Sequence, residues 1–197
     1  MMLEKVGIDK NSSVLDIGCG NGRIAEYISD ITGARVTGID YIPEAIDTAR
    51  KRTASKSDRL RFQIGDIENP VETGQSFDLV LSIDTMYFSD ADTLLAAWRK
   101  LLKPDGLMAI FYLSLDGSDI SAVLDKNSLV YDVYDLSREH WEHMQYKHAI
   151  VKEMKEKFES EGNLFVWENL KMESVSDQSP FDPEKTPMRR YLYIVKR

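Results

Sequence analysis

Four aspartates in the first half of the chain mark places where a ligand could bind. Asp16 lies two residues before a glycine-rich segment, Asp40 ends a second apolar run, and Asp66 and Asp84 follow two further runs. At the carboxyl ends of parallel strands, such residues share the sheet edge where ligands of open α/β folds bind. A row of carboxylates attracts positive charge and hydroxyl or amino donors, and it repels a polyphosphate. Asp40 and Asp66 could instead be turn or N-cap residues, and the two roles are compatible.

The glycine-rich segment predicts a close approach of the backbone to a nucleotide. Gly18, Gly20 and Gly22 alternate between an apolar run and a helical pattern. Glycines permit the tight turn, and N–H groups at the start of the helix would face the ligand. A turn that binds nothing is the other interpretation, and three alternating glycines make it less favoured.

The spacing departs from the dinucleotide fingerprint. The pattern G-x-G-x-x-G or A needs a small residue where this chain has Arg23, whose long side chain would prevent close packing of helix on strand. A carboxylate at Asp16 would also repel a pyrophosphate. S-adenosylmethionine fits better, because it carries a sulfonium, an ammonium group, ribose hydroxyls and an adenine amine but no phosphate.

Alternating strands and helices must position these residues. The expected strands are 13–17, 35–39, 61–64, 77–83 and 107–113. Helical patterns follow at Ile24 and Ile28, after Pro43, and after Asp90, which is typical of an N-cap. Segment 103–106, Lys-Pro-Asp-Gly, predicts the end of that last helix and a turn. The alternation indicates a parallel sheet with right-handed crossovers.

The second half of the chain is less regular. No clear period runs through 116–136, and a long helix is expected from near Ser137 to Gly162. Two final strands are expected at 164–167 and 191–195, separated by a proline-containing loop at 174–188. Since no internal repeat is found, residues 1–197 are predicted to form a single domain.

Composition narrows the class of partner. The 197 residues are 43% hydrophobic and 29% charged, with 25 Lys+Arg and 33 Asp+Glu for a net charge of −8. The acidity is evenly spread, so a nucleic-acid partner is not expected. Cys19 is the only cysteine, and neither a signal-peptide core nor an apolar stretch of membrane-spanning length is found. We therefore expect a cytoplasmic protein without a membrane segment.

Taken together, the motifs resemble those of class I S-adenosylmethionine-dependent methyltransferases. The resemblance rests on 16–22, 38–41, 65–67, 77–80 and 101–106, in the order and spacing of the family. It implies an α/β fold with a doubly wound, seven-stranded, mostly parallel sheet of order 3-2-1-4-5-7-6, strand 7 being antiparallel. Strand candidates 164–167 and 191–195 would be the sixth and seventh.

The resemblance also implies which residues hold the cofactor, S-adenosylmethionine. Its methionine end would contact residues in and just before the glycine loop, namely Asp16, Gly18, Cys19, Gly20 and Gly22. The backbone carbonyl of Ser82, at the end of the fourth strand, would face the ammonium group.

The nucleoside end would contact residues after the second and third strands. Asp40 would accept hydrogen bonds from the ribose hydroxyls, with Tyr41 and Ile42 flanking the adenine. Asp66 would accept from the adenine amino group, and the Ile67 backbone N–H would face a ring nitrogen.

Methyl transfer from a sulfonium is an in-line displacement, so the protein must mainly hold the acceptor atom near the methyl carbon and exclude water. A general base is needed only where the attacking atom must lose a proton. Asp84 and Tyr87, just past the fourth strand, are the catalytic candidates, with a turn carboxylate and a packed aromatic as the alternative interpretation. His140 and His143 share a predicted helix, where a solvated helix start is favoured over a metal site.

A small-molecule acceptor is expected by elimination among the family's substrates. After the fourth strand the chain lacks the Asp/Asn-Pro-Pro-aromatic motif of members that methylate amines of DNA bases, and Cys19 lies in the cofactor loop rather than in position to methylate cytosine C5. One alternative is a non-catalytic S-adenosylmethionine-binding module. The other, disfavoured by Arg23 and Asp16, is an NAD-dependent oxidoreductase.

The chain departs from the family in the segment that would cover the substrate side of the site. Small-molecule members usually carry helices before the glycine loop that close over the site, whereas only 13 residues precede Val14 here. The cover could come from 116–146 and 174–188, from a partner, or from a missing start of the chain. We expect the two internal segments to form it.

Overall fold

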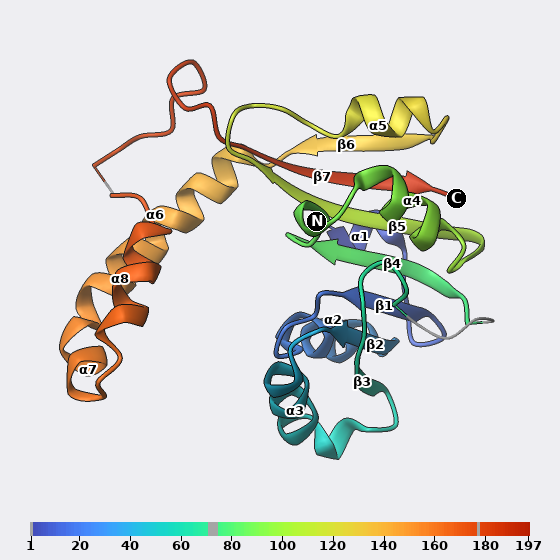
Figure 1. Ribbon diagram of the computed structural model, residues 1–197, viewed down its shortest axis with the longest axis horizontal. Helices are drawn as coiled ribbons and strands as arrows, with labels where there is room; N and C mark the ends of the chain where they lie inside the picture. Colours follow the sequence, from blue (N-terminus) through green and yellow to red (C-terminus); the bar gives the residue numbers. More distant parts are fainter. Residues whose placement is uncertain (1, 71–74, 177) are drawn as a thin grey trace. The chain divides into compact units, whose positions relative to one another are not determined.

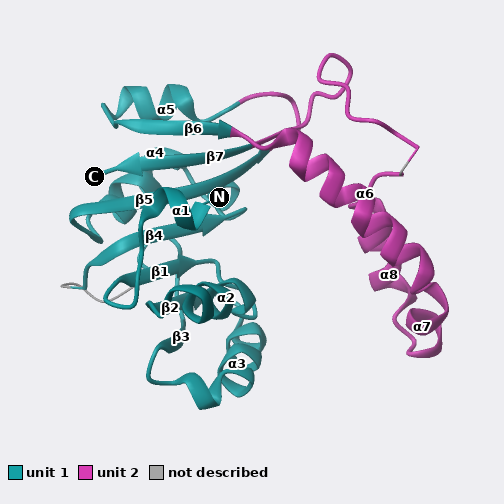
Figure 2. Ribbon diagram, turned by 180° about the vertical axis from the view of Figure 1, so that it is seen from behind, with its two compact units in different colours: residues 1–113, 119–134, 191–197 teal, residues 114–118, 135–190 magenta. Residues whose placement is uncertain are grey.

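The computed structural model (Figure 1) describes residues 2–70, 75–176 and 178–197. The chain forms two compact units, coloured separately in Figure 2. The sheet unit comprises residues 1–113, 119–134 and 191–197, and the helical unit comprises residues 114–118 and 135–190.

The sheet unit is built on a seven-stranded sheet. Its strands are β1 (Ser13–Ile17), β2 (Arg35–Asp40), β3 (Leu60–Ile64), β4 (Phe77–Ile83), β5 (Leu102–Ser114), β6 (Tyr131–Asp135) and β7 (Arg189–Lys196). Their order is β3-β2-β1-β4-β5-β7-β6, with β1 to β5 parallel and β7 antiparallel. In Figure 1 the β7 arrow accordingly points opposite to those of β4 and β6. The fold class and strand order expected from the resemblance are confirmed.

Helices connect and flank the strands of the sheet unit. They are α1 (Met2–Val6), α2 (Arg23–Thr32), α3 (Pro43–Arg52), α4 (Ala91–Arg99) and α5 (Ser121–Lys126), with short 3-10 turns at Ala54–Lys56 and Met86–Phe88. Asp90 caps α4 as expected, because its carboxylate accepts a hydrogen bond from the Thr93 backbone N–H at 2.9 Å. Pro43 is the first residue of α3, where its fixed φ favours the helix.

The helical unit contains three helices that pack on one another. They are α6 (Ser137–Glu153), α7 (Lys155–Ser160) and α8 (Leu164–Met172). The indole N–H of Trp167 in α8 donates to the backbone carbonyl of Val151 in α6 at 2.7 Å. The long helix expected from Ser137 to Gly162 is therefore present as α6 and α7, which are separated at Met154.

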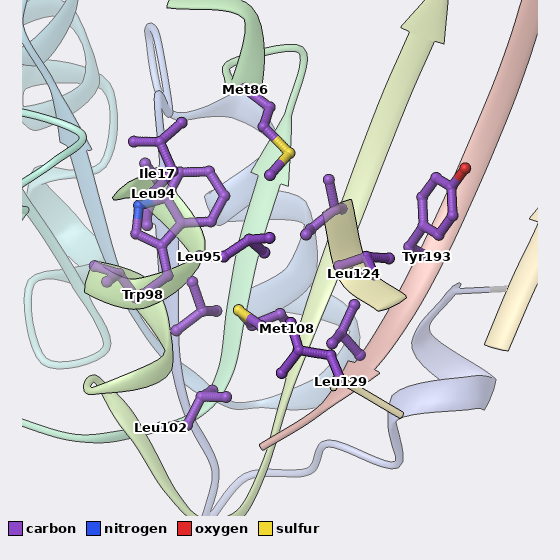
Figure 3. Close-up of a cluster of buried hydrophobic side chains, with 14 of the residues drawn as sticks. Ile17, Met86, Leu94, Leu95, Trp98, Leu102, Met108, Leu124, Leu129 and Tyr193 are labelled. Atoms are coloured by element: carbon purple, nitrogen blue, oxygen red, sulfur yellow. The ribbon is translucent and has the colours of Figure 1, made fainter. Parts of the chain in front are cut away.

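The core of the sheet unit joins β1, β4, β5 and β7 to α4 and α5 (Figure 3). Trp98 of α4 and Tyr193 of β7 are its largest fully buried side chains. Burying a large apolar side chain contributes about 2–3 kcal/mol of stability. The indole N–H of Trp98 also donates to the Ile67 backbone carbonyl at 2.7 Å, so the core holds the segment just beyond β3 in place.

One of the strands expected in the second half is wrong. Segment 164–167 is the start of α8 and not a strand. Its residues, Leu-Phe-Val-Trp, fit a strand and a helical turn equally well, and the bond from Trp167 to Val151 favours the helix. The sixth strand is instead β6, in the segment without a clear period. Its side chains are exposed or half-buried because β6 is the last strand and has a neighbour on one side only.

The turn expected at 103–106 is also wrong. Helix α4 ends at Arg99 and β5 begins at Leu102, so the four residues are part of the strand. The pairing register between β4 and β5 shifts between Phe77 and Leu79, an irregularity of the kind a β-bulge produces.

Candidate functional site

The carboxyl ends of β1 to β4 meet at one edge of the sheet, because these neighbouring strands are parallel. Asp40, Asp66 and Asp84 line a cavity of about 740 Å³ at this edge, hereafter the wide cavity. Asp16 lines a smaller one of about 330 Å³, hereafter the loop cavity. The structure thus brings the four aspartates to one edge.

The two cavities are neighbouring parts of one hollow, since Gly18 and Ile83 line both. The wide cavity is lined by Gly18, Asp40, Tyr41, Ile42, Ile64, Gly65, Asp66, Ile67, Ile83, Asp84, Thr85 and Phe88. The loop cavity is lined by Asp16, Gly18, Cys19, Gly20, Asn21, Arg23, Ile24 and Ile83. Of the site residues expected from the sequence, Gly22, Ser82 and Tyr87 are in neither lining.

The loop between β1 and α2 is held to β2 through its backbone. The N–H groups of Gly18 and Cys19 both donate to the Ile39 carbonyl, at 2.9 and 2.8 Å. Gly18, Gly20 and Gly22 have φ values of +72°, +52° and +74°. Glycine adopts this left-handed conformation at little cost, so the backbone of the loop requires the alternating glycines.

The glycines of this loop have different surroundings. A Cβ atom on Gly18 would lie 1.9 Å from Cγ2 of Thr85, and one on Gly22 would lie 2.4 Å from Cε1 of Phe62. A Cβ atom on Gly20 would meet nothing within 4 Å. Packing therefore needs Gly18 and Gly22 to be small, whereas Gly20 faces the open space of the loop cavity.

Asp40 is buried and bonded to the backbone on both sides. Its Oδ2 accepts from the Gly20 N–H at 2.8 Å, and its Oδ1 accepts from the Ile42 N–H at 2.9 Å. Each carboxylate oxygen has two lone pairs, so these bonds leave acceptor capacity for ligand hydroxyls. Asp40 is thus both a structural support of the glycine loop and part of the wall of the wide cavity.

Asp16 is buried at this edge of the sheet, and its pKa is raised. It is 2% exposed, and its Oδ2 is buried without a hydrogen-bond partner among the described residues. Burial, and next the negative charge of Asp40, raise the pKa of Asp16 to about 7. A buried acceptor without a partner at a cavity wall fits a ligand that brings a donor or a positive charge. An ammonium group supplies both.

The wide cavity combines its carboxylates with exposed apolar side chains. Tyr41, Ile64 and Phe88 are 68%, 55% and 72% exposed, which is unusual for large apolar residues gathered at one place. Asp66 lies among them, with Oδ1 accepting from the Glu68 backbone N–H at 2.7 Å. Such a wall suits a flat, aromatic, uncharged ring with polar edges. Ile64 and Phe88 were not among the site residues expected from the sequence, although Ile64 directly ends the run before Gly65 and Asp66.

Asp84 and Tyr87 form a hydrogen-bonded pair at the end of β4. The Tyr87 hydroxyl donates to Oδ1 of Asp84 at 2.9 Å and accepts from the Leu113 backbone N–H at 2.5 Å. Asp84 has a φ of +56°, which is uncommon for a residue with a side chain and costs about 1–2 kcal/mol. Asp84 lines the wide cavity, so this strained residue borders the hollow at the end of β4.

Ser82 and Cys19 have buried side chains with structural contacts. Ser82 is fully buried, and its Oγ lies 2.5 Å from Oγ1 of Thr85. Cys19 lines the loop cavity, and burial raises the pKa of its thiol, so it stays protonated and is a poor nucleophile.

Two other features concern metals and membranes. Among the described residues, no group of three or more His, Cys, Asp and Glu side chains could hold a metal ion, and this includes the surroundings of His140 and His143. No helix in residues 2–70, 75–176 and 178–197 is long and apolar enough to cross a membrane.

Comparison with known proteins gives a family match over most of the chain. The family model described as "Methyltransferase domain" matches residues 8–172. Methyltransferase GfsG of Streptomyces halstedii is 30% identical over 112 residues, and the ubiquinone biosynthesis O-methyltransferase of Bartonella tribocorum is 32% identical over 101 residues. These matches cover 55% and 51% of this chain and 40% of each relative, so this chain spans less than half the length of either.

Solved structures show the same fold. Phosphoethanolamine N-methyltransferase 2 of Haemonchus contortus, in complex with S-adenosyl-L-methionine, superposes with a TM-score of 0.78. The superposition covers 98% of this chain and 50% of that chain, at 18% sequence identity. At this identity the likeness concerns the fold alone.

Proposed function

The chain belongs to the class I S-adenosylmethionine-dependent methyltransferases, and we propose that it transfers the cofactor's methyl group to a small-molecule acceptor. The observation that carries the proposal is the buried Oδ2 of Asp16, which has no hydrogen-bond partner in the described part of the chain and lies beside the glycine loop, next to a cavity with an apolar wall. The curated relatives include an enzyme named for ubiquinone biosynthesis, which supports a metabolite as acceptor.

The residues present fit the cofactor. Asp16 would bind its ammonium group, with Gly18, Cys19 and Gly20 forming the loop around the methionine end. The Ser82 side chain is buried, so its proposed contact would involve the backbone carbonyl alone. Gly22 would act indirectly, as the left-handed residue that starts α2.

The nucleoside would occupy the wide cavity. Asp40 would accept from the ribose hydroxyls while keeping its bonds to the loop. Tyr41 and Ile42 would flank the adenine, and Asp66 and Ile67 would bind its polar edge. When bound, the cofactor supplies a methyl group activated by a sulfonium.

The chain's own residues would position the acceptor, exclude water and accept a proton. Apolar side chains of the wide cavity reduce the water around the reacting atoms. Asp84, whose Oδ1 accepts from the Tyr87 hydroxyl, would accept the proton of an attacking hydroxyl or amine. Tyr87 would be a positioning residue, because its hydroxyl is bonded to the Leu113 backbone and to Asp84.

We propose that parts of 116–146 and 174–188 cover the substrate side of a single functional domain, residues 1–197. Segment 116–146 follows β5, whose carboxyl end lies on the same edge as that of β4 because the two strands are parallel. Within this segment, Ile120, Leu124 and Leu129 are buried in the core. The cover would therefore come from the residues before and after them.

The proposed setting is cytoplasmic, with no nucleic-acid partner. A single cysteine and a net charge of −8 support this.

The test is formation of S-adenosylhomocysteine from S-adenosylmethionine with a panel of hydroxyl- and amine-bearing metabolites. Product with at least one metabolite and none with buffer is the expected result. Tight cofactor binding without product across the panel would favour a non-catalytic binding module instead. An Asp16→Asn variant serves as the control, because it keeps the fold and removes the carboxylate.

A further inference from the structure

The helical unit contains a basic cavity that the proposed methyl transfer does not use. Its volume is about 320 Å³, and its lining consists of His148, Lys152, Lys155, Trp167 and Lys171. Among the described residues that form this wall there is no acid, although the chain as a whole has 33 acidic and 25 basic residues. The cavity is therefore a local concentration of positive charge in an acidic protein.

Among the residues that the structure describes, no carboxylate pairs with the ammonium groups of this cavity. Other lysines of the chain pair with acids, as Lys147 does with Glu173 at 2.8 Å. Within the described part of the chain, neither Lys152 nor Lys155 nor Lys171 forms such an ion pair. Uncompensated like charges around one cavity repel each other, and a bound anion removes that repulsion.

Two of these lysines are held against the same aromatic ring. The Nζ atoms of Lys155 and Lys171 lie 5.4 and 5.1 Å from the centroid of the Trp167 ring. Cation–π contacts of this kind attract each lysine to the ring and so keep both charges at the cavity. The ring itself is fixed, because its N–H donates to the Val151 carbonyl at 2.7 Å.

The histidine of the cavity is also held in one orientation. The Ser174 hydroxyl donates its proton to the Lys171 carbonyl at 2.7 Å. Its contact with Nδ1 of His148 at 3.0 Å therefore requires the histidine to donate from Nδ1. Hydrogen bonds thus fix the histidine and the indole of the cavity, and the three exposed lysines surround these two rings.

We propose that this cavity binds a phosphate-type oxyanion carried by a small soluble molecule. Three ammonium groups match a phosphate dianion better than a single carboxylate, and lysine binds phosphate as a compact point charge. The volume exceeds that of a phosphate group, so there is room for an organic part against the indole of Trp167. The inference is independent of the acceptor proposed for methyl transfer.

The experiment is a titration of the full, ¹⁵N-labelled chain with inorganic phosphate and then with phenyl phosphate, at constant ionic strength set by chloride. The indole N–H signal of Trp167, assigned through Trp167→Phe, should shift saturably. The signal of Trp98, whose N–H is bonded to Ile67 inside the core, should not. Absence of a saturable shift of Trp167 would overturn the proposal.

Variants distinguish a site from general charge attraction. Lys152→Gln combined with Lys171→Gln should weaken binding by about tenfold or more. The matched control is Lys157→Gln combined with Lys196→Gln, which also removes two positive charges but at exposed lysines outside the lining, and it should leave the affinity unchanged. Equal affinities for phenyl phosphate in the cavity variant and in the control variant would contradict the site. Unchanged binding of S-adenosylhomocysteine verifies that the double variant is folded, and Lys155→Gln replaces it if it is not.

A second arm distinguishes the source of the phosphate. Phosphatidylcholine vesicles with and without phosphatidic acid are sedimented with the protein. Binding to the acidic vesicles that depends on Lys152 and Lys171, without any response to phenyl phosphate, would replace the soluble ligand with a lipid headgroup and overturn the proposal as stated.

Discussion

The carboxylate of Asp40 accepts a hydrogen bond from the backbone N–H of Gly20 at 2.8 Å, so the end of β2 holds the loop that follows β1. The negative charge of Asp40 also helps to raise the pKa of Asp16, which lies in the neighbouring strand β1. One residue therefore shapes the glycine loop and adds to the effect of burial on the pKa of the acid that we propose binds the cofactor's ammonium group.

Replacing Asp40 should affect both stability and cofactor binding. Asp40→Ala removes the acceptor of two backbone N–H groups and should lower the free energy of unfolding by about 2 kcal/mol, leaving the protein folded. Affinity for S-adenosylmethionine should fall because a proposed ribose acceptor and the loop geometry are both lost. Urea unfolding and calorimetry measure the two effects. Unchanged affinity would remove Asp40 from the site.

Asp16 should make the protein less stable as the pH rises. Its pKa of about 7 in the folded protein exceeds the ordinary value of 3.8, so folding takes up a proton between these limits. The free energy of unfolding should therefore fall across that window, by up to about 4 kcal/mol, and level off above about pH 7. The carboxyl groups with lowered pKa, such as that of Asp116, give the opposite trend at lower pH.

The contribution of Asp16 is measured as the difference in free energy of unfolding between the native chain and the Asp16→Asn variant. That difference should change with pH only between the two pKa values, since the amide does not titrate. If the difference in free energy of unfolding between the two proteins is the same at all pH values, the Asp16 carboxyl has an ordinary pKa.

Two glycine substitutions should separate packing from ligand space. Gly18→Ala should cost about 3 kcal/mol of stability, because left-handed backbone strain adds to a collision with Cγ2 of Thr85. Gly20→Ala should cost only the strain, about 1–2 kcal/mol, but should weaken cofactor binding because the new methyl group enters the loop cavity.

A second substitution tests the collision directly. Thr85→Ser removes Cγ2 and keeps the hydroxyl that contacts Ser82. Combined with Gly18→Ala, it should recover part of the lost stability measured by thermal unfolding. No recovery in the double variant would mean that the cost lies wholly in the backbone.

The positions of β1 to β5 were predictable because these strands are apolar runs that end near a glycine or an aspartate. Their order in the sheet followed from the resemblance to the methyltransferase family and not from the runs themselves. β6 was not predictable in the same way. This strand lies at the edge of the sheet with one neighbouring strand, and its side chains are exposed or half-buried. Burial therefore imposes little hydrophobic pattern on its sequence, Tyr-Asp-Val-Tyr-Asp. The run at 164–167 was ambiguous, and the packing of Trp167 against α6 determines its helical state.

The site was predictable as a row of acids but not as a shaped cavity. The positions of Asp16 and Asp40 follow from strand ends. The bond between Asp40 and Gly20 depends on the left-handed conformation of the loop, which sequence spacing does not contain. The apolar wall formed by Ile64 and Phe88 was missed because exposed hydrophobic residues follow no period.

If Asp84 is the proton acceptor, Asp84→Asn should lower turnover with a proton-losing acceptor about a hundredfold. Cofactor affinity and stability should stay nearly constant, because asparagine tolerates the positive φ of this position. Tyr87→Phe should have a smaller effect, because Asp84 keeps its carboxylate and loses only the hydrogen bond that orients it. Full activity in Asp84→Asn would make Asp84 a structural residue.

The most direct measurement is calorimetric titration of the purified chain with S-adenosylhomocysteine and, separately, with NAD. We expect saturable heat with the phosphate-free nucleoside, greatly reduced in Asp16→Asn, and none with the pyrophosphate-bearing dinucleotide. Uptake of NAD without a response to S-adenosylhomocysteine would contradict a ligand hollow built around acidic side chains.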